Sequence, residues 1–82
     1  MADERTTDFL AKDGAVMTDE VGVITGDLTL RTTVNDQGAV EQRVQYKDAG
    51  EWYTLTGAPA TLPEGQDVDA LHSHTVTQLS QG

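Results

Sequence analysis

Residues 27–46 read DLTLRTTVNDQGAVEQRVQY and carry the clearest structural signal in the chain. In the first half, every second residue from Leu28 to Val34 belongs to a candidate buried face. In the second half, Val40 and Val44 alternate with polar residues in the same way. Alternation with a period of two, rich in β-branched residues, is typical of strands covered on one face. The stretch therefore predicts two antiparallel strands.

The loop between these strands sets their register. Asp36-Gln37-Gly38 fits a three-residue hairpin loop, because its last position needs a positive φ that glycine adopts freely. Closing the loop with Asn35 opposite Ala39 predicts the pairs Val34 with Val40, Leu30 with Val44, and Leu28 with Tyr46. The same register places Arg31 opposite Arg43, and like charges directly across a sheet are unfavourable.

A second turn, Asp48-Ala49-Gly50, repeats the form of the first and predicts a third strand. The same three-residue geometry places Trp52 opposite Tyr46, on the buried face. A two-residue turn at Ala49-Gly50 would shift the strand by one residue and expose Trp52, but it needs Ala49 at a positive φ. The first turn is favoured, and Trp52 is predicted to be in the core. Tyr53 and Leu55 then project from the opposite face.

Upstream of the hairpin, VGVITGD predicts a short strand from Val21 to Thr25 that turns at Gly26-Asp27 and pairs with the strand containing Leu28. Val21 and Val23 would then join the Leu28 face.

The N-terminal part of the chain has a mixed pattern. Residues 1–19 are expected to be a separate N-terminal segment, either partly disordered or with a short helix over Thr7–Lys12 that ends at Gly14. Residues 20–82 are expected to form a single small domain.

The C-terminal stretch DVDALHSHTVTQLSQG, residues 67–82, predicts a helix. Asp67 suits the N-cap, and Asp69 suits the positive end of the helix dipole. Its serine, threonine and histidine residues are poor helix formers, so a strand over HTVTQL is the alternative. With the helix, the predicted fold is α+β: an antiparallel β-meander of three to four strands with the C-terminal helix packed on one face.

Composition excludes several classes of function. The chain of 82 residues has no cysteine, a net charge of −9, and only five lysine and arginine residues, which are scattered. Direct binding of nucleic acid needs clustered basic residues, and a membrane span needs about twenty apolar residues, so we expect neither. The N-terminus has no signal-peptide pattern, which predicts a cytoplasmic location. An acidic nucleic-acid mimic is a remaining alternative.

His72 and His74 are the two histidines of the chain. On a strand they would share a face and could bind a metal, whereas on a helix they would point about 200° apart. The helical reading therefore predicts no metal site and no cofactor, with His72 and His74 as the alternative for a metal- or small-ligand-binding protein. No nucleophile lies beside a base in a catalytic pattern, so we predict that the protein is not an enzyme.

The remaining prediction for function is a small acidic protein–protein interaction module. Tyr53 and Leu55 would stand exposed on the second face of the sheet, near Arg43 and beside an open edge strand. Apolar side chains next to unpaired backbone favour association with a protein partner or with a second copy of the chain. Tyr53, Leu55 and Arg43 are therefore the predicted partner-binding residues.

Overall fold

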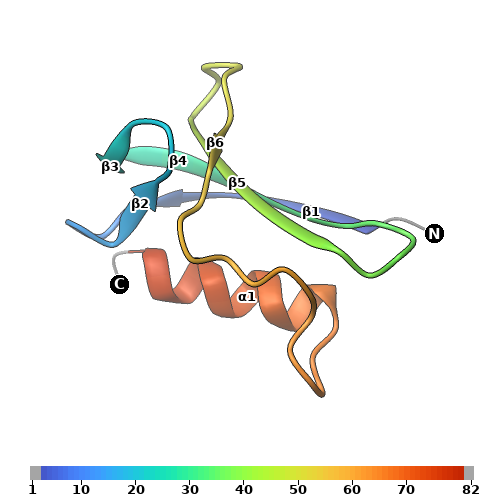
Figure 1. Ribbon diagram of the computed structural model, residues 1–82. Coiled ribbons are helices and arrows are strands. Elements are labelled where there is room, and N and C mark those ends of the chain that lie inside the picture. The colour runs from blue at the N-terminus through green and yellow to red at the C-terminus, as the bar shows by residue number, and fades with distance from the viewer. Residues whose placement is uncertain (1–2, 81–82) are drawn as a thin grey trace.

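The computed structural model describes residues 3–80, which form an antiparallel sheet, a small hairpin and one helix (Figure 1). The elements in chain order are β1 (Asp3–Leu10), β2 (Val16–Thr18), β3 (Gly22–Ile24), β4 (Asp27–Val34), β5 (Val40–Tyr46), β6 (Tyr53–Thr54) and α1 (Val68–Leu79). The main sheet has the order β1-β4-β5-β6, and β2 pairs with β3 separately. The predicted α+β class, with an antiparallel sheet and a C-terminal helix, is confirmed.

The hairpin of β4 and β5 has the predicted register. Val34 lies opposite Val40, Leu30 opposite Val44, and Leu28 opposite Tyr46. Gly38 takes a φ of +83°, and the side chain of Asn35 accepts hydrogen bonds from the N–H groups of Gln37 and Ala39. The alternation of the sequence and the chemistry of this loop therefore led to the same pairing.

The N-terminal segment differs from the prediction. Instead of a short helix over Thr7–Lys12, the structure has strand β1 along its full length, antiparallel to β4, with Phe9 opposite Leu28. Arg5, Thr7 and Phe9 face the helix, whereas the residues between them are exposed. The short helix was wrong because this weak alternation gains a partner in β4, whose backbone would otherwise be unpaired on that side.

Strand β3 also differs from the prediction, because β1 occupies the edge of β4 where β3 was expected. Strand β3 pairs with β2 instead, with Met17 opposite Val23. Val21 and Val23 are about half exposed, at 51% and 50%, rather than part of the Leu28 face. Ile24 alone of this stretch enters the core.

The turn between β5 and β6 corrects the placement of Trp52. Tyr53, and not Thr54, lies opposite Val44, so the strand is shifted by one residue from the predicted register. The shift goes in the opposite direction to the two-residue alternative. In the longer loop that results, Asp48 (φ +62°) and Gly50 (φ +78°) both adopt left-handed conformations.

A shift of one residue exchanges the faces of a strand. Trp52 is half-buried on the outer face, where the guanidinium of Arg31 lies 4.2 Å from the centre of its ring. Leu55 is buried, and Tyr53 packs against the core. Arg43 forms an ion pair of 2.8 Å with Glu41. The like-charge pair of Arg31 and Arg43 is thus relieved by a ring on one side and a carboxylate on the other.

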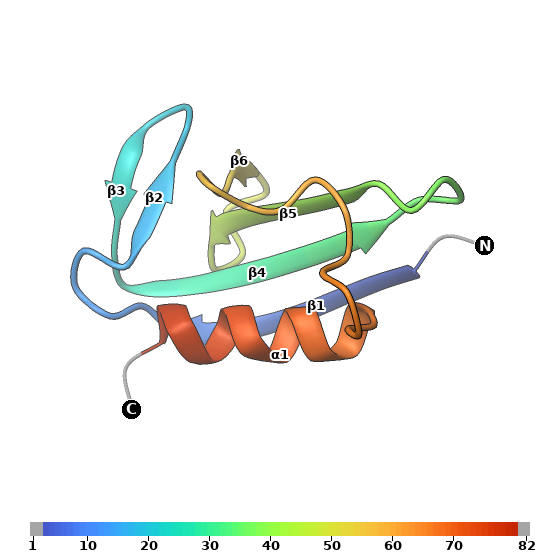
Figure 2. The ribbon, with the colours of Figure 1, turned by 60° about the horizontal axis from the view of Figure 1, so that its bottom comes forward.

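The helix α1 covers the other face of the sheet and runs along β1 and β4 (Figure 2). Its N-cap is Asp67, whose side chain accepts a hydrogen bond of 2.8 Å from the N–H of Ala70. The predicted helix, and not the strand alternative, is confirmed. The main core cluster between helix, sheet and hairpin consists of Phe9, Ala11, Val16, Ile24, Leu28, Leu30, Val44, Leu55 and Leu79. A second cluster of Val34, Val40, Val68 and Leu71 lies near the start of the helix.

Candidate functional site

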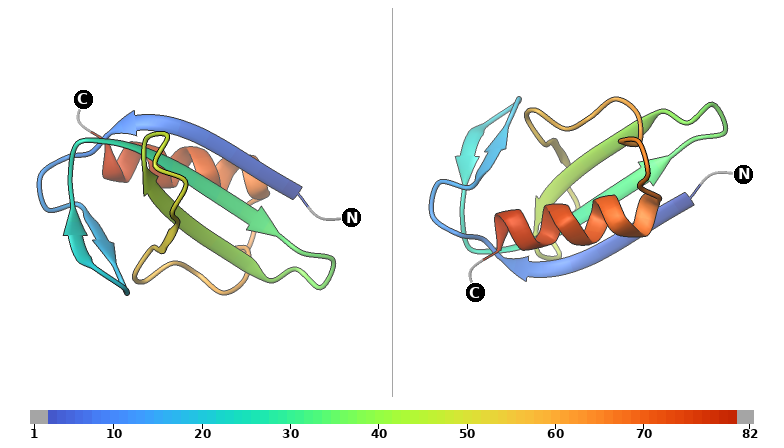
Figure 3. Two further views of the ribbon diagram at one scale, coloured as in Figure 1. Left: turned by 90° about the horizontal axis from the view of Figure 1, so that it is seen from above. Right: turned by 90° about the horizontal axis from the view of Figure 1, so that it is seen from below.

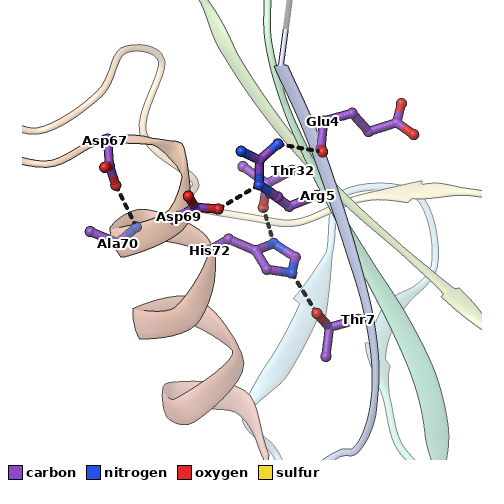
Figure 4. Close-up of polar contacts among 8 residues, drawn as sticks. All are labelled: Glu4, Arg5, Thr7, Thr32, Asp67, Asp69, Ala70 and His72. Carbon is purple, nitrogen blue, oxygen red and sulfur yellow. Dashed lines mark hydrogen bonds and ion pairs between the residues drawn. The ribbon is translucent and has the colours of Figure 1, made fainter.

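A chain of hydrogen-bonded polar side chains lies between α1 and the sheet, and His72 is at its centre (Figure 4). His72 is only 7% exposed. Its Nδ1 lies 2.8 Å from Oγ1 of Thr32 on β4, and its Nε2 lies 2.8 Å from Oγ1 of Thr7 on β1. The imidazole therefore connects the helix to two neighbouring strands.

The network continues from Thr32 towards β5. The side-chain amide of Gln42 donates to Oγ1 of Thr32 at 3.2 Å and to Oγ1 of Thr75 at 2.9 Å, and Thr75 donates to the carbonyl of Leu71. Among the described residues, no buried side-chain nitrogen or oxygen is left without a partner. A fully satisfied buried network favours one docking position of the helix over others.

The surroundings of His72 favour its neutral form. Each ring nitrogen lies within hydrogen-bond distance of a threonine hydroxyl, and a hydroxyl can donate or accept, so Thr32 and Thr7 satisfy a neutral imidazole in either tautomer. Burial lowers the pKa of the imidazole below its ordinary value of 6.5, the guanidinium of Arg5 lowers it further, and Asp69 opposes both. His72 is therefore neutral at pH 7.

The network was missed by the sequence analysis, although a signal for it was present. The predicted register already placed Thr32 opposite Gln42 on the otherwise apolar face, and the structure has this pair. Two polar residues that face each other inside a core need partners, because unsatisfied buried polar groups cost free energy. Such a pair predicts a polar group on the covering element, and that group is His72.

Next to this network, strand β1 forms one outer edge of the sheet, as both views in Figure 3 show. In an antiparallel ladder, consecutive residues point their backbone groups to opposite sides. Ala11 donates its N–H to the carbonyl of Gly26, towards β4, and Lys12 donates in the opposite direction, to the carbonyl of Leu79. The even-numbered residues of β1 therefore direct their N–H and C=O groups away from β4.

The two ends of this edge are occupied, and its centre is open. At one end, Nη1 of Arg5 donates to the carbonyl of Glu4 at 2.8 Å, while its Nε pairs with the carboxylate of Asp69 and holds the pKa of that group below its ordinary value. At the other end, the carbonyl of Leu79, at the end of α1, accepts a hydrogen bond of 2.7 Å from the N–H of Lys12. Between them, within residues 3–80, no strand pairs with the outward backbone groups of Thr6 and Asp8.

A groove of about 270 Å³ lies below the open part of this edge. Its walls are Thr7 of β1 and the side chains of His72, Ser73, Val76 and Thr77 of α1. The lining is uncharged, since His72 is neutral, and it combines hydroxyl groups with one partly buried apolar residue. We call the outward backbone of Thr6 and Asp8 together with this groove the β1 edge site.

The two histidines predicted as the alternative metal site are not brought together. His72 is buried against the sheet, whereas His74 is exposed and lines a different groove with Met17 and Gln78. No cluster of three His, Cys, Asp or Glu side chains suitable for a metal ion occurs within residues 3–80.

The three predicted partner-binding residues do not form one surface. Leu55 is 8% exposed in the main core cluster and Tyr53 packs against that cluster, so both lie on the face covered by the helix and hairpin. Arg43 lies on the opposite face with Glu41. The predicted arrangement of Tyr53 and Leu55 is wrong because it depended on the register of β6.

Two further findings concern the described residues and the comparison of the chain with known proteins. No helix among the described residues is long and apolar enough to cross a membrane. Comparisons of the chain with protein-family models, with curated proteins and with solved structures gave no match.

Proposed function

We propose that the protein is a small, non-enzymatic interaction module that adds an extended segment of a partner protein to the β1 edge site. The observation that supports this is the open centre of the β1 edge directly above an uncharged groove. Strand addition to a sheet edge derives affinity from main-chain hydrogen bonds and specificity from pockets for alternate side chains. The β1 edge site offers both components. The cytoplasmic location remains a prediction from the sequence.

A partner of different sequence suits this edge better than a second copy of the chain. In a dimer formed by two β1 strands related by a two-fold axis, the numbers of each directly opposed pair of residues add up to the same value. That value is even, because opposed residues must lie on the same face of the sheet. If Thr6 faces its own copy, Glu4 lies opposite Asp8, and if Thr6 faces Leu10, Asp8 lies opposite itself. These two registers oppose like charges, whereas the register that places Thr6 opposite Asp8 does not; in every register the net charge of −9 on each copy adds repulsion.

One substitution separates strand addition from other forms of binding. Thr6→Pro removes an N–H group that points away from β4, so the β1–β4 ladder loses no hydrogen bond. Thr6→Val is the matched control, because it keeps this N–H and suits an exposed strand position. We expect the free energy of unfolding of Thr6→Val to lie within about 0.5 kcal/mol of that of the wild type. Thr6→Pro should remain folded, because only its outward N–H is lost, and urea unfolding of both variants checks this.

The binding assay compares these variants as bait in lysate of the source cells. We expect proteins captured by the wild type to be retained by Thr6→Val and lost by Thr6→Pro. Hydrogen exchange of the purified complex should then show new protection at the amides of Thr6 and Asp8. Equal capture by all three proteins, or protection elsewhere on the surface, would overturn the proposed site.

A further inference from the structure

We infer that the segment that binds at the β1 edge site is basic, with lysine or arginine on its outward face and small uncharged residues on its groove face. This inference rests on the proposed function and adds the chemical class of the partner. It follows from the different surroundings that the two faces of an added strand would meet.

The outward face of an added strand would meet the acidic side chains of β1. Directly opposed residues of paired strands lie on the same face of a sheet, so residues opposite Thr6 and Asp8 would lie within reach of the carboxylates of Glu4 and Asp8. Both side chains are exposed. The structure records no ion pair of Glu4 within residues 3–80, and Asp8 has only a distant one, at 3.9 Å from Lys47.

The remaining contacts of Asp8 leave it able to accept a further donor. Its Oδ1 accepts a hydrogen bond of 2.6 Å from the hydroxyl of Thr29, and its side chain is 57% exposed. An ionised carboxylate has about four acceptor positions, so one hydroxyl and one distant ammonium do not saturate it. Glu4 and Asp8 flank Thr6 on one face, so a basic residue opposite Thr6 would lie diagonal to both carboxylates, and a second one opposite Asp8 would lie beside its carboxylate.

The groove face would meet different chemistry. A residue opposite Thr7 would point towards Ser73, Val76 and Thr77 of α1, where the lining has hydroxyl groups and no carboxylate. A charged side chain placed there would lose hydration without an opposite charge nearby, which is costly. A valine or threonine suits both the lining and the extended backbone.

The net charge of the protein supports the same choice of partner. A chain with a net charge of −9 attracts basic segments over a distance and repels acidic ones. This long-range attraction is screened by salt, so the association rate of a basic segment should fall as ionic strength rises.

Synthetic peptides of alternating sequence test the inference on the whole protein. The probe is the capped peptide KTKVKTK, with ETEVETE and STSVSTS as acidic and neutral counterparts, each followed by NMR on isotope-labelled protein. We expect the basic peptide to shift the amide resonances of Thr6 and Asp8 and those of Ser73–Thr77. The neutral peptide should bind more weakly at the same place, and the acidic peptide should not bind.

Charge variants of the protein provide the matched controls. The double variant Glu4→Gln/Asp8→Asn should weaken binding of the basic peptide by about two- to fivefold per site, the range of exposed ion pairs. The double variant Asp19→Asn/Glu20→Gln changes the charge equally beside β6, on the opposite edge of the sheet, and should weaken binding less, because it alters only the long-range attraction.

The possible outcomes separate the inference from the proposed function. Equal binding of the basic and neutral peptides at the β1 edge site would overturn the basic class and support strand addition. Equal weakening by both double variants would overturn the role of Glu4 and Asp8. Absence of binding by every peptide, together with unchanged capture by Thr6→Pro, would overturn the proposed function itself. Shifts of Thr6 and Asp8 that depend on protein concentration alone would identify a second copy as the occupant.

Discussion

Replacing Thr32 by valine tests the buried network that joins α1 to the sheet. The side chain of Thr32 is fully buried, at 0% exposure, and its hydroxyl contacts both Nδ1 of His72 and the amide of Gln42. Valine has nearly the same shape as threonine, so the substitution removes the hydroxyl without opening a cavity. Any loss of stability would then report the hydrogen bonds rather than the packing.

The expected loss follows from the groups left without partners. Nδ1 of His72 loses its hydrogen-bond partner, and a buried unsatisfied group costs about 1–3 kcal/mol. One amide proton of Gln42 loses its acceptor as well, although the bond of Gln42 to Thr75 remains. The free energy of unfolding should therefore fall by about 2–4 kcal/mol. A domain of 82 residues has in total about 4–12 kcal/mol, so this loss is a large part of its stability.

Urea unfolding followed by circular dichroism measures this difference. The control is Thr33→Val, which changes the neighbouring residue on the outer face, where its side chain is only partly buried. We expect Thr33→Val to lie within about 0.5 kcal/mol of the wild type. Thermal melts should show a decrease of about 4–8 °C for each kcal/mol lost by Thr32→Val. If Thr32→Val were as stable as Thr33→Val, the described network would be refuted.

Three further predictions follow from the same packing. Leu55→Ala should reduce the free energy of unfolding by about 2–5 kcal/mol, because Leu55 is in the core. Trp52→Ala should reduce it by only about 1 kcal/mol, mainly through loss of the contact of Trp52 with Arg31. If urea unfolding showed the larger loss for Trp52→Ala, this would contradict the register of β6. Asp67→Ala removes the N-cap of α1 and should cost about 1 kcal/mol, with Asp67→Asn as the control that keeps an acceptor. Because the fold lowers the pKa of His72 below 6.5, the unfolded chain takes up this proton at higher pH; the stability from the neutral imidazole is therefore complete above pH 6.5 and falls as the pH drops below that value. Urea unfolding in the range from about pH 7.5 to about pH 5 measures this, and His72→Gln should remove that part of the pH dependence; an equal slope in both proteins would show that other groups cause it.

The hairpin of β4 and β5 and the helix α1 were predictable from the sequence because both depend on local chemistry. In the hairpin, the alternating apolar residues and Gly38 at the end of a short loop favour one register. In the helix, the Asp67 cap and the spacing of the apolar residues act within a few turns. When the local preferences of a segment all favour the same structure, contacts with the rest of the chain seldom change that structure.

The candidate site was not predictable in the same way, since it depends on which strand occupies the free side of β4. Two segments competed for that side, the stretch around Val23 and the stretch of β1, and both had weak alternation. The packing of Phe9 against Leu28 and of α1 along β1 decided between them. Only this choice creates an open edge above Ser73 and Val76.

The amino-acid sequence by itself determined the β4–β5 register, the C-terminal helix, and the acidic charge of the chain. The tertiary structure decided the position of β1, the face on which Trp52 lies, and the burial of His72. For Trp52 the deciding difference was one residue in the turn, where Asp48 adopts a left-handed conformation that aspartate takes up less readily than glycine. The core gained from Leu55 and Tyr53 on the inner face stabilises that conformation, and this gain exists only once the helix and hairpin cover them.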